Sequence, residues 1–241
     1  MTRIADRQFN DGAGTNQHGK QGVHAYSLDP VAKPVCTKPS LVTDNDLSKN
    51  NVCQRLRLET RAEHDAIECT LGLMAPALSE AEYRRCLTKF YGFYRPVERE
   101  LVACLQGSAW DGVMTGRRKV DLLRHDLQCL GVTDPDATPV CTALPALPTA
   151  AAAFGCLYVF EGATLGGQII SRHVASRLGY GAQHGAAFFH GYGSETSVMW
   201  RTFGHSLTAF AAESKTDDEI VAAAVSTFRA LRFWCEGEET A

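Results

Sequence analysis

The chain has 241 residues, of which 45% are hydrophobic and 21% charged, and its formal net charge is −3 at pH 7. A chain of this length and composition can bury a sizeable core, and its slight negative charge argues against a nucleic-acid partner. The start of the chain lacks the apolar stretch of a signal peptide, and no window approaches 18 consecutive apolar residues, so we expect a cytoplasmic protein without membrane contact.

Residues 1–48 predict a disordered, low-complexity N-terminal tail. They are rich in Gly, Asn, Asp, Thr, Lys and Pro and show no sustained periodicity, so they bury too little apolar surface to offset the entropy of ordering. Residues 14–21 nearly match the phosphate-binding pattern Gly-x4-Gly-Lys-Ser/Thr, but Gln21 lacks the hydroxyl that would hold magnesium and no buried strand precedes it. We therefore expect no nucleotide site there, and we assign the folded domain to residues 49–241.

The first helical periodicity places a histidine on an inward stripe. Residues at steps of three and four share one helix face: Leu56, Thr60, His64, Ile67 and Leu71. A lone inward histidine is more often a core residue than a metal ligand. However, Glu68 lies one turn further on and could accept the second ring N–H, an arrangement that orients a ligating imidazole. Arg57, about two turns earlier, could meet an anion near this helix.

The later elements are also helical. Ser79-Glu-Ala-Glu82 is a capping box that opens a long helix with an aromatic face. Further helices are predicted at about 117–130, 149–178, 194–212 and 217–235, with a Pro-rich loop at 133–148. The run Arg117-Arg118-Lys119 is expected to form a solvated first turn. Alternating apolar runs are missing, so the sequence predicts an all-α domain of six or more helices.

Several metal and catalytic patterns are missing from the chain. The nine cysteines include no Cys-x-x-Cys pair, so we interpret them as structural rather than as zinc or iron–sulfur ligands. No Glu precedes a His by three positions, which argues against a di-iron carboxylate site. The patterns His-Glu-x-x-His and Gly-x-Ser-x-Gly are absent as well.

A cluster of glycines interrupts the most apolar predicted helix. Gly162, Gly166 and Gly167 occupy three of six positions shortly after the apolar run 154–160. Together they cost the helix about 3 kcal/mol relative to alanine. Either close packing between helices or a flat ligand lying on bare backbone would justify this cost, and the residues alone leave both interpretations open.

Two segments together resemble the haem oxygenase family. They are Leu56-Arg-Leu-Glu-Thr60-Arg-Ala-Glu-His64-Asp-Ala-Ile-Glu68 and, about a hundred residues later, Gly162-Ala-Thr-Leu-Gly166-Gly167-Gln168. The resemblance covers residues 50 to 236 and is closest to bacterial biliverdin-forming members, including those associated with bacteriophytochromes. It implies an all-α, haem oxygenase-like multi-helix bundle. Such a bundle holds haem between a proximal helix, whose histidine ligates iron, and a kinked, glycine-rich distal helix.

The resemblance also assigns roles by position. His64 would be the metal ligand, Gly162 and Gly166 the distal contacts, and Gly167 the residue that permits the kink. The cofactor-binding set would be Arg57, Thr60, Glu68, Arg201, His205 and Phe228, with the basic members near the haem propionates and Phe228 lining the pocket. Ala163 stands where animal-type members carry an Asp that organises distal water; Thr164 and Glu161 are nearby candidates for that task.

The reaction implied is cleavage of haem by O2 to biliverdin, iron and carbon monoxide, with haem as both substrate and cofactor. The electrons would come from an external donor, a ferredoxin or a reductase, since the chain contains no flavin or iron–sulfur motif. A non-catalytic haem-binding sensor or carrier is the alternative, and a haem-free helical relative is a third hypothesis. The biliverdin could serve a bilin-binding phytochrome, or the reaction could serve iron acquisition.

Overall fold

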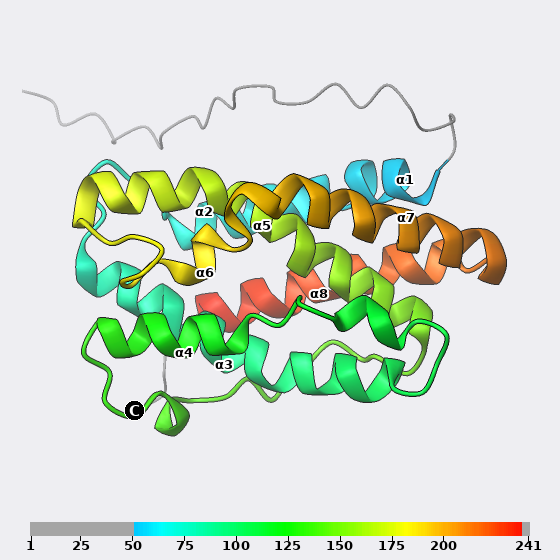
Figure 1. Cartoon of the computed structure of the whole chain (residues 1–241), viewed down its shortest axis with the longest axis horizontal. Helices are drawn as coiled ribbons and strands as arrows, with labels where there is room; N and C mark the ends of the chain where they lie inside the picture. Colours follow the sequence, from blue (N-terminus) through cyan, green and yellow to red (C-terminus); the bar gives the residue numbers. More distant parts are fainter. Residues whose placement is uncertain (1–50, 238–241) are drawn as a thin grey trace, which may run out of the picture. The chain divides into compact units, whose positions relative to one another are not determined.

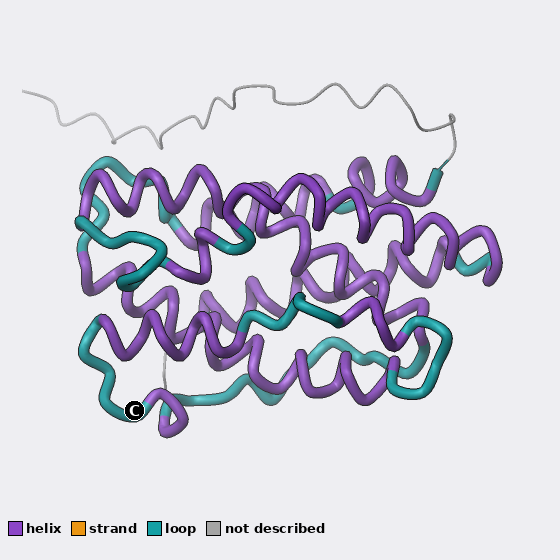
Figure 2. The backbone as a smooth tube through the Cα atoms, viewed as in Figure 1, coloured by secondary structure: helices purple, strands orange, loops and turns teal. Residues whose placement is uncertain are grey.

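The structure is a computed structural model that describes residues 51–237. These residues form helices joined by loops, and the described part contains no β-strand beyond isolated bridges of Gly181 (Figure 2). The α-helices are α1 (Val52–Glu59), α2 (Arg61–Leu71), α3 (Glu80–Leu105), α4 (Val120–Cys129), α5 (Ala150–Leu178), α6 (Ala187–His190), α7 (Thr196–Ser214) and α8 (Asp217–Glu236). Three short 3-10 helices are η1 (Asp111–Met114), η2 (Pro135–Ala137) and η3 (Gly193–Glu195). The all-α prediction is confirmed, whereas the tail expected at 1–48 and the segment 14–21 lie outside the described residues.

The single helix predicted through Leu56 and Leu71 is divided into α1 and α2 at Thr60. Backbone hydrogen bonds continue across the junction, from Thr60 N to Leu56 O at 3.0 Å and from His64 N to Thr60 O at 2.9 Å. The Thr60 hydroxyl also donates to the Leu56 carbonyl at 2.6 Å. A threonine whose hydroxyl bonds back to the preceding turn bends a helix. The hydrophobic periodicity therefore continues from α1 into α2 although the helix is interrupted at Thr60.

Helix α3 begins where the capping box predicted. The Ser79 hydroxyl accepts from Glu82 N, and the Glu82 carboxylate accepts from Ser79 N at 2.9 Å. Helix α4 begins at Val120, three residues later than expected. The buried Glu98 carboxylate of α3 accepts from the backbone N–H groups of Lys119 and Val120, so a side chain from another helix caps its first turn.

Helix α5 is the central helix, and it bends along its length (Figure 1). The Thr149 hydroxyl accepts from Ala152 N at 3.1 Å to cap its first turn, and Gly179 ends it with φ +76°. By length and composition α5 is apolar enough to cross a membrane, but 56% of its most apolar window is buried inside the protein. This burial is what the core helix of a bundle shows.

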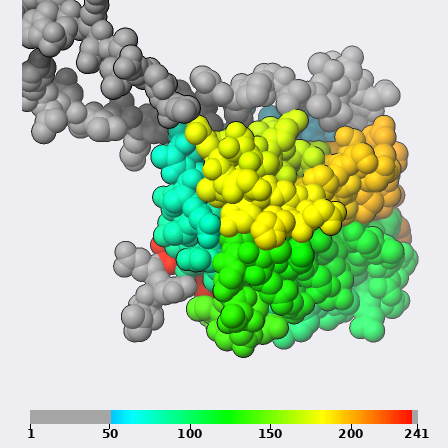
Figure 3. Space-filling view, turned by 60° about the vertical axis from the view of Figure 1, so that its left-hand side comes forward, coloured from blue at the N-terminus to red at the C-terminus, as the bar shows by residue number. Residues whose placement is uncertain are grey.

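The helices are held together by contacts between residues that are distant in sequence. Figure 1 shows α3 and α4 along one edge of the bundle, α7 and the second half of α5 along the opposite edge, and α8 between them. Helix α2 packs against α8, where Glu63 pairs with Arg229 at 2.6 Å. The segment that follows α5 lies on the α4 surface (Figure 3), and both oxygens of the buried Asp126 accept from the N–H groups of Ala187 and Phe188 at 2.8 Å.

Helix α5 packs closely against α8 at Gly155. A Cβ added there would lie 2.2 Å from the Ile220 carbonyl oxygen and 2.9 Å from Ala224 N. We therefore expect Gly155→Ala to lower the free energy of unfolding by about 1–3 kcal/mol, because neither backbone can move without disturbing the core. Urea denaturation checks this. Gly204→Ala on α7 is the control, since its Cβ would meet nothing within 4 Å; equal losses in both variants would contradict the explanation.

The cysteines agree with the structural interpretation. Of the cysteines within residues 51–237, Cys86, Cys141 and Cys156 are buried. Burial raises the pKa of the Cys156 thiol to about 12, which keeps it protonated and unreactive at neutral pH.

Candidate functional site

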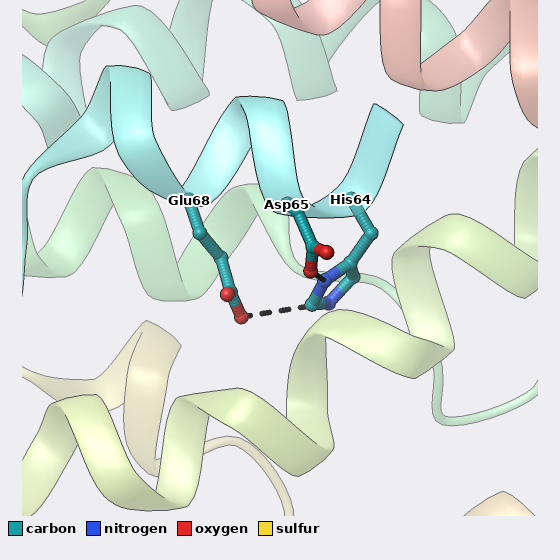
Figure 4. A group of neighbouring side chains, drawn as sticks. All are labelled: His64, Asp65 and Glu68. Carbon is teal, nitrogen blue, oxygen red and sulfur yellow. Dashed lines mark ion pairs between the residues drawn. The ribbon is translucent and has the colours of Figure 1, made fainter. Parts of the chain in front are cut away.

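The imidazole of His64 lies on α2 with 44% of its side chain exposed. Figure 4 shows His64, Asp65 and Glu68 pointing from α2 toward the yellow-green ribbon of α5. The His64 Nε2 atom lies 3.6 Å from the Glu68 carboxylate and Nδ1 lies 3.8 Å from that of Asp65. Both distances slightly exceed a hydrogen bond, so a small rotation lets a carboxylate accept one ring N–H and leaves the other nitrogen for a ligand.

Phe228 and Thr60 support His64 from inside the bundle. The Phe228 ring, 6% exposed on α8, meets the imidazole edge-on with 5.8 Å between ring centroids. Thr60 is buried, and its hydroxyl is engaged with the Leu56 carbonyl and the Tyr158 side chain. Thr60 therefore joins α1 and α2, and the direct cofactor contact expected from the sequence stays a prediction.

The three clustered glycines of α5 divide into two kinds. A Cβ at Gly166 would meet nothing within 4 Å, and one at Gly162 would meet only the Trp200 ring, at 4.0 Å. A Cβ at Gly167, in contrast, would lie 2.7 Å from the Phe189 carbonyl oxygen. The packing interpretation therefore applies to Gly167, which permits close packing against α6. At Gly162 and Gly166 no described residue covers the backbone closely, and the ligand interpretation stays a prediction.

The uncovered glycines belong to an apolar helix face. Leu165 and Ile169 are 41% and 39% exposed, and the spacing of three and four residues places them on the same side of α5 as Gly162 and Gly166. No polar side chain interrupts these four positions. An exposed apolar helix face of this kind is typical of a surface that receives a ligand. The imidazole of His64 points from α2 toward the same helix (Figure 4).

The basic candidates lie at exposed positions. Arg57 is exposed on the last turn of α1. Burial raises the pKa of the Tyr158 hydroxyl, and the Thr60 hydrogen bond and the nearby Arg57 charge partly offset this rise. Arg201 and His205 are exposed one turn apart on α7, and neither makes a hydrogen bond or ion pair with residues 51–237. Arg201 adjoins Trp200, whose ring would lie 4.0 Å from a Cβ added at Gly162. All three side chains are thus free to meet anionic groups.

The prediction of a solvated turn at Arg117-Arg118-Lys119 is wrong. Only Arg118 is solvated; Arg117 and Lys119 are 6% and 2% exposed and both pair with the Glu161 carboxylate, which is 1% exposed. The physical reason is that Glu161 follows the apolar run 154–160 and must be buried with it, and a buried carboxylate requires cations or hydrogen-bond donors. The single acidic residue directly after that run, Glu161, was the signal from which buried basic partners could have been predicted.

The same contacts decide which group could replace the Asp missing at Ala163. The Thr164 hydroxyl is buried and donates to the Glu161 carbonyl at 2.6 Å. The Glu161 carboxylate accepts from Arg117, Lys119 and Tyr192. The polar groups of both candidates are therefore engaged inside the protein. Which group organises water over the glycine face stays a prediction.

Comparisons with known proteins identify the family of the chain. Residues 50–236 match the family model described as Heme oxygenase. A heme oxygenase of Xanthomonas campestris pv. campestris is 33% identical over 124 residues, which are 50% of this chain and 68% of that protein.

Solved heme oxygenase structures share the fold. The structure from Leptospira interrogans has a TM-score of 0.66 at 20% identity and covers 77% of this chain and 98% of its own. The NO- and CO-bound structures from Neisseria meningitidis give 0.61 at 24% identity, with 80% and 96% covered. The haem complex from the cyanobacterium Synechocystis gives 0.63 at 15% identity, with 77% and 90% covered.

The all-helical fold and the family match place the chain in a class of haem-binding proteins. Within that class, the chain belongs to the haem oxygenase family. It is therefore an enzyme that cleaves haem oxidatively to biliverdin, iron and carbon monoxide, as the sequence predicted.

Proposed function

We propose that His64 is the axial ligand of the haem iron and that Gly162 and Gly166 lie against the opposite face of the macrocycle. The observation that carries the proposal is the pairing of a half-exposed imidazole, which points from α2 toward α5, with glycines of α5 whose missing side chains leave open space. Bound haem supplies the redox chemistry and is itself the substrate.

The protein's own residues then bind and orient the substrate. The imidazole of His64 holds one side of the iron, and the Glu68 carboxylate accepts its second ring N–H and so fixes the ring. Phe228 limits rotation of the imidazole from behind. Without side chains at Gly162 and Gly166, the helix lies directly on the macrocycle, and the apolar Leu165 and Ile169 exclude bulk water around it.

The exposed basic residues are proposed to set the in-plane orientation of haem. Arg57 on α1 and the pair Arg201 and His205 on α7 could each attract a propionate carboxylate. Such contacts contribute modestly to affinity at a solvated edge, but they discriminate between rotated positions of the macrocycle. They therefore bear on which meso carbon is cleaved.

We further propose that electrons come from an external ferredoxin or reductase in the cytoplasm, because the chain has no flavin or iron–sulfur motif. For the product, we infer that biliverdin is passed to a bilin-binding phytochrome, as in the bacteriophytochrome-associated members of the family. Co-expression with an apo-phytochrome in a host that lacks haem oxygenase should then yield a photoconvertible protein. Growth of the native organism on haem as its sole iron source, lost on deletion of the gene, would instead favour iron acquisition.

Reconstitution tests the proposal. Haem added to the purified protein should produce a Soret band, and reductant in air should replace it with the absorption of biliverdin and release carbon monoxide. A haem complex whose spectrum persists under reductant and air would favour the alternative, a non-catalytic sensor or carrier. Absence of a Soret band would contradict both functions.

A further inference from the structure

A buried charge cluster lies directly beside the first distal glycine. We call Arg117, Lys119, Glu161 and Tyr192 the Glu161 cluster. Lys119 Nζ donates to the Glu161 carboxylate at 3.2 Å, to the Arg117 carbonyl at 2.9 Å and to the Tyr192 hydroxyl, so all three of its N–H groups are used. Tyr192 donates onward to Glu161 at 2.7 Å, and Arg117 donates to the other Glu161 oxygen.

Burying the charged groups of the Glu161 cluster carries a desolvation cost in free energy. Two cations face one carboxylate inside the protein, and burial lowers the pKa of Lys119, an effect that the Glu161 charge partly offsets. Burial likewise raises the pKa of the Tyr192 hydroxyl, and the Glu161 charge raises it further. Apolar residues of similar volume would stabilise a fold at least as well as buried ion pairs generally do. What the charged groups add is geometry, because each hydrogen bond fixes a distance and a direction.

The cluster connects α5 to three other parts of the fold. Arg117 and Lys119 belong to the segment before α4, Tyr192 precedes η3, and the second guanidinium nitrogen of Arg117 donates to the Met199 carbonyl of α7 at 3.1 Å. Its acidic member, Glu161, lies in α5 immediately before Gly162. Segments from before and after α5 in the chain therefore hold the helix at one defined point.

A second set of contacts holds α5 just beyond the glycine stretch. Gly167 packs against the Phe189 carbonyl, and Gln168 Nε2 donates to the His190 carbonyl at 2.7 Å. Phe189, His190 and Tyr192 all belong to residues 187–195. One segment thus holds α5 on both sides of residues 162–166, and the buried Asp126 holds the start of that segment on α4.

From this arrangement we propose that the Glu161 cluster and residues 187–195 form a clamp that positions the glycine face of α5 against the macrocycle. Glycine weakens a helix because it has more backbone freedom than other residues, so Gly162 and Gly166 make the stretch 162–166 more mobile unless contacts on both sides hold it. The inference rests on the proposed role of Gly162 and Gly166. It makes Arg117, Lys119, Glu161 and Tyr192 positioning residues that touch neither substrate nor iron.

The primary test is Tyr192→Phe, which removes one hydroxyl from the clamp. The matched control is Tyr83→Phe, because the buried Tyr83 hydroxyl donates to a single acceptor, the Gly185 carbonyl at 2.8 Å, outside the Glu161 cluster. In haem-free protein, we expect hydrogen exchange of the amides at 162–166 to become about tenfold faster in Tyr192→Phe, the typical effect of losing a hydrogen bond to a charged group. Exchange there should be unchanged in Tyr83→Phe.

The second readout is the ratio of biliverdin isomers formed by the haem complex. A loosened glycine face should admit more than one orientation, so Tyr192→Phe should increase the minor isomers relative to both wild type and Tyr83→Phe. General destabilisation lowers the amount of product without changing this ratio. Because Glu161→Gln alone leaves two buried cations without an anion, the double variant Lys119→Met/Glu161→Gln provides the second test, with the same two expected changes.

Equal hydrogen-exchange rates at 162–166 in Tyr192→Phe and Tyr83→Phe would overturn the clamp. Faster exchange combined with an unchanged ratio of biliverdin isomers, in both Tyr192→Phe and the double variant, would overturn it as well. Failure of the proposed haem site would look different. In that case the wild-type protein itself would bind no haem, whereas the exchange measurement on haem-free protein would still report whether the cluster holds α5.

Discussion

The His64→Ala variant is expected to lose haem turnover while keeping the stability of the wild type. The imidazole is half exposed and makes no hydrogen bond shorter than 3.5 Å within the described residues, so its removal should change the free energy of unfolding by no more than about 0.5 kcal/mol. Turnover should fall by about 100-fold or more, since loss of even an outer hydrogen-bond partner of a ligating histidine costs 10- to 100-fold.

The measurement for His64→Ala combines the Soret spectrum, the rate of biliverdin formation and the thermal midpoint. His184→Ala is the matched control, because His184 is an exposed histidine in the loop after α5. It should retain the wild-type spectrum and rate. If His64→Ala has the Soret band and rate of the control, another residue ligates the iron and the proposed site is wrong.

The second large effect is an opposite response of two adjacent glycines. Gly166→Ala should stabilise the haem-free protein by up to about 1 kcal/mol, because alanine favours a helix and its Cβ meets nothing within 4 Å. The same methyl group should hold the macrocycle away from the backbone, so we expect weaker haem binding and at least about tenfold slower turnover, the equivalent of 1.4 kcal/mol. Stability and activity should therefore change in opposite directions.

Gly167→Ala should show the reverse pattern. Its Cβ would lie 2.7 Å from the Phe189 carbonyl oxygen, so the substitution should lower the free energy of unfolding by about 1–3 kcal/mol through overpacking. Denaturant titration of both haem-free variants, followed by haem titration, checks the pair. A Gly166→Ala protein that binds and cleaves haem like the wild type would show that the macrocycle does not lie on this stretch of α5.

These two glycines illustrate why function and stability are separate constraints on α5. An alanine at residue 166 should improve the haem-free helix, and no described residue lies where its Cβ would be, so the proposed haem contact would supply a reason for the glycine. At residue 167 the protein itself supplies the reason. The distinction cannot be read from adjacent identical letters in a sequence, because the difference lies in what stands opposite each Cα atom.

The amino-acid sequence alone determined the helices and the residues of the two motifs. Hydrophobic periodicity, the Ser79–Glu82 capping box and the glycine at residue 179 act within one or two turns, so they could be recognised without coordinates. His64 and the glycine stretch could also be found, because each belongs to a local pattern and the pair resembles a known family. The expected break-free helix through Thr60 failed because a side-chain hydrogen bond bent it.

Only the tertiary structure decided which polar residues are buried together and which glycines are open. Arg117 meets Glu161 across 44 residues of sequence, and Tyr192 joins them from a further segment, so neither contact leaves a periodic signal. Burial of Glu161 with its apolar neighbours created the need for those partners, and the fold selected them from residues that look like ordinary surface charges. Local patterns depend on neighbours along the chain, whereas desolvated charges and backbone approaches depend on what the packed helices bring within a few ångströms.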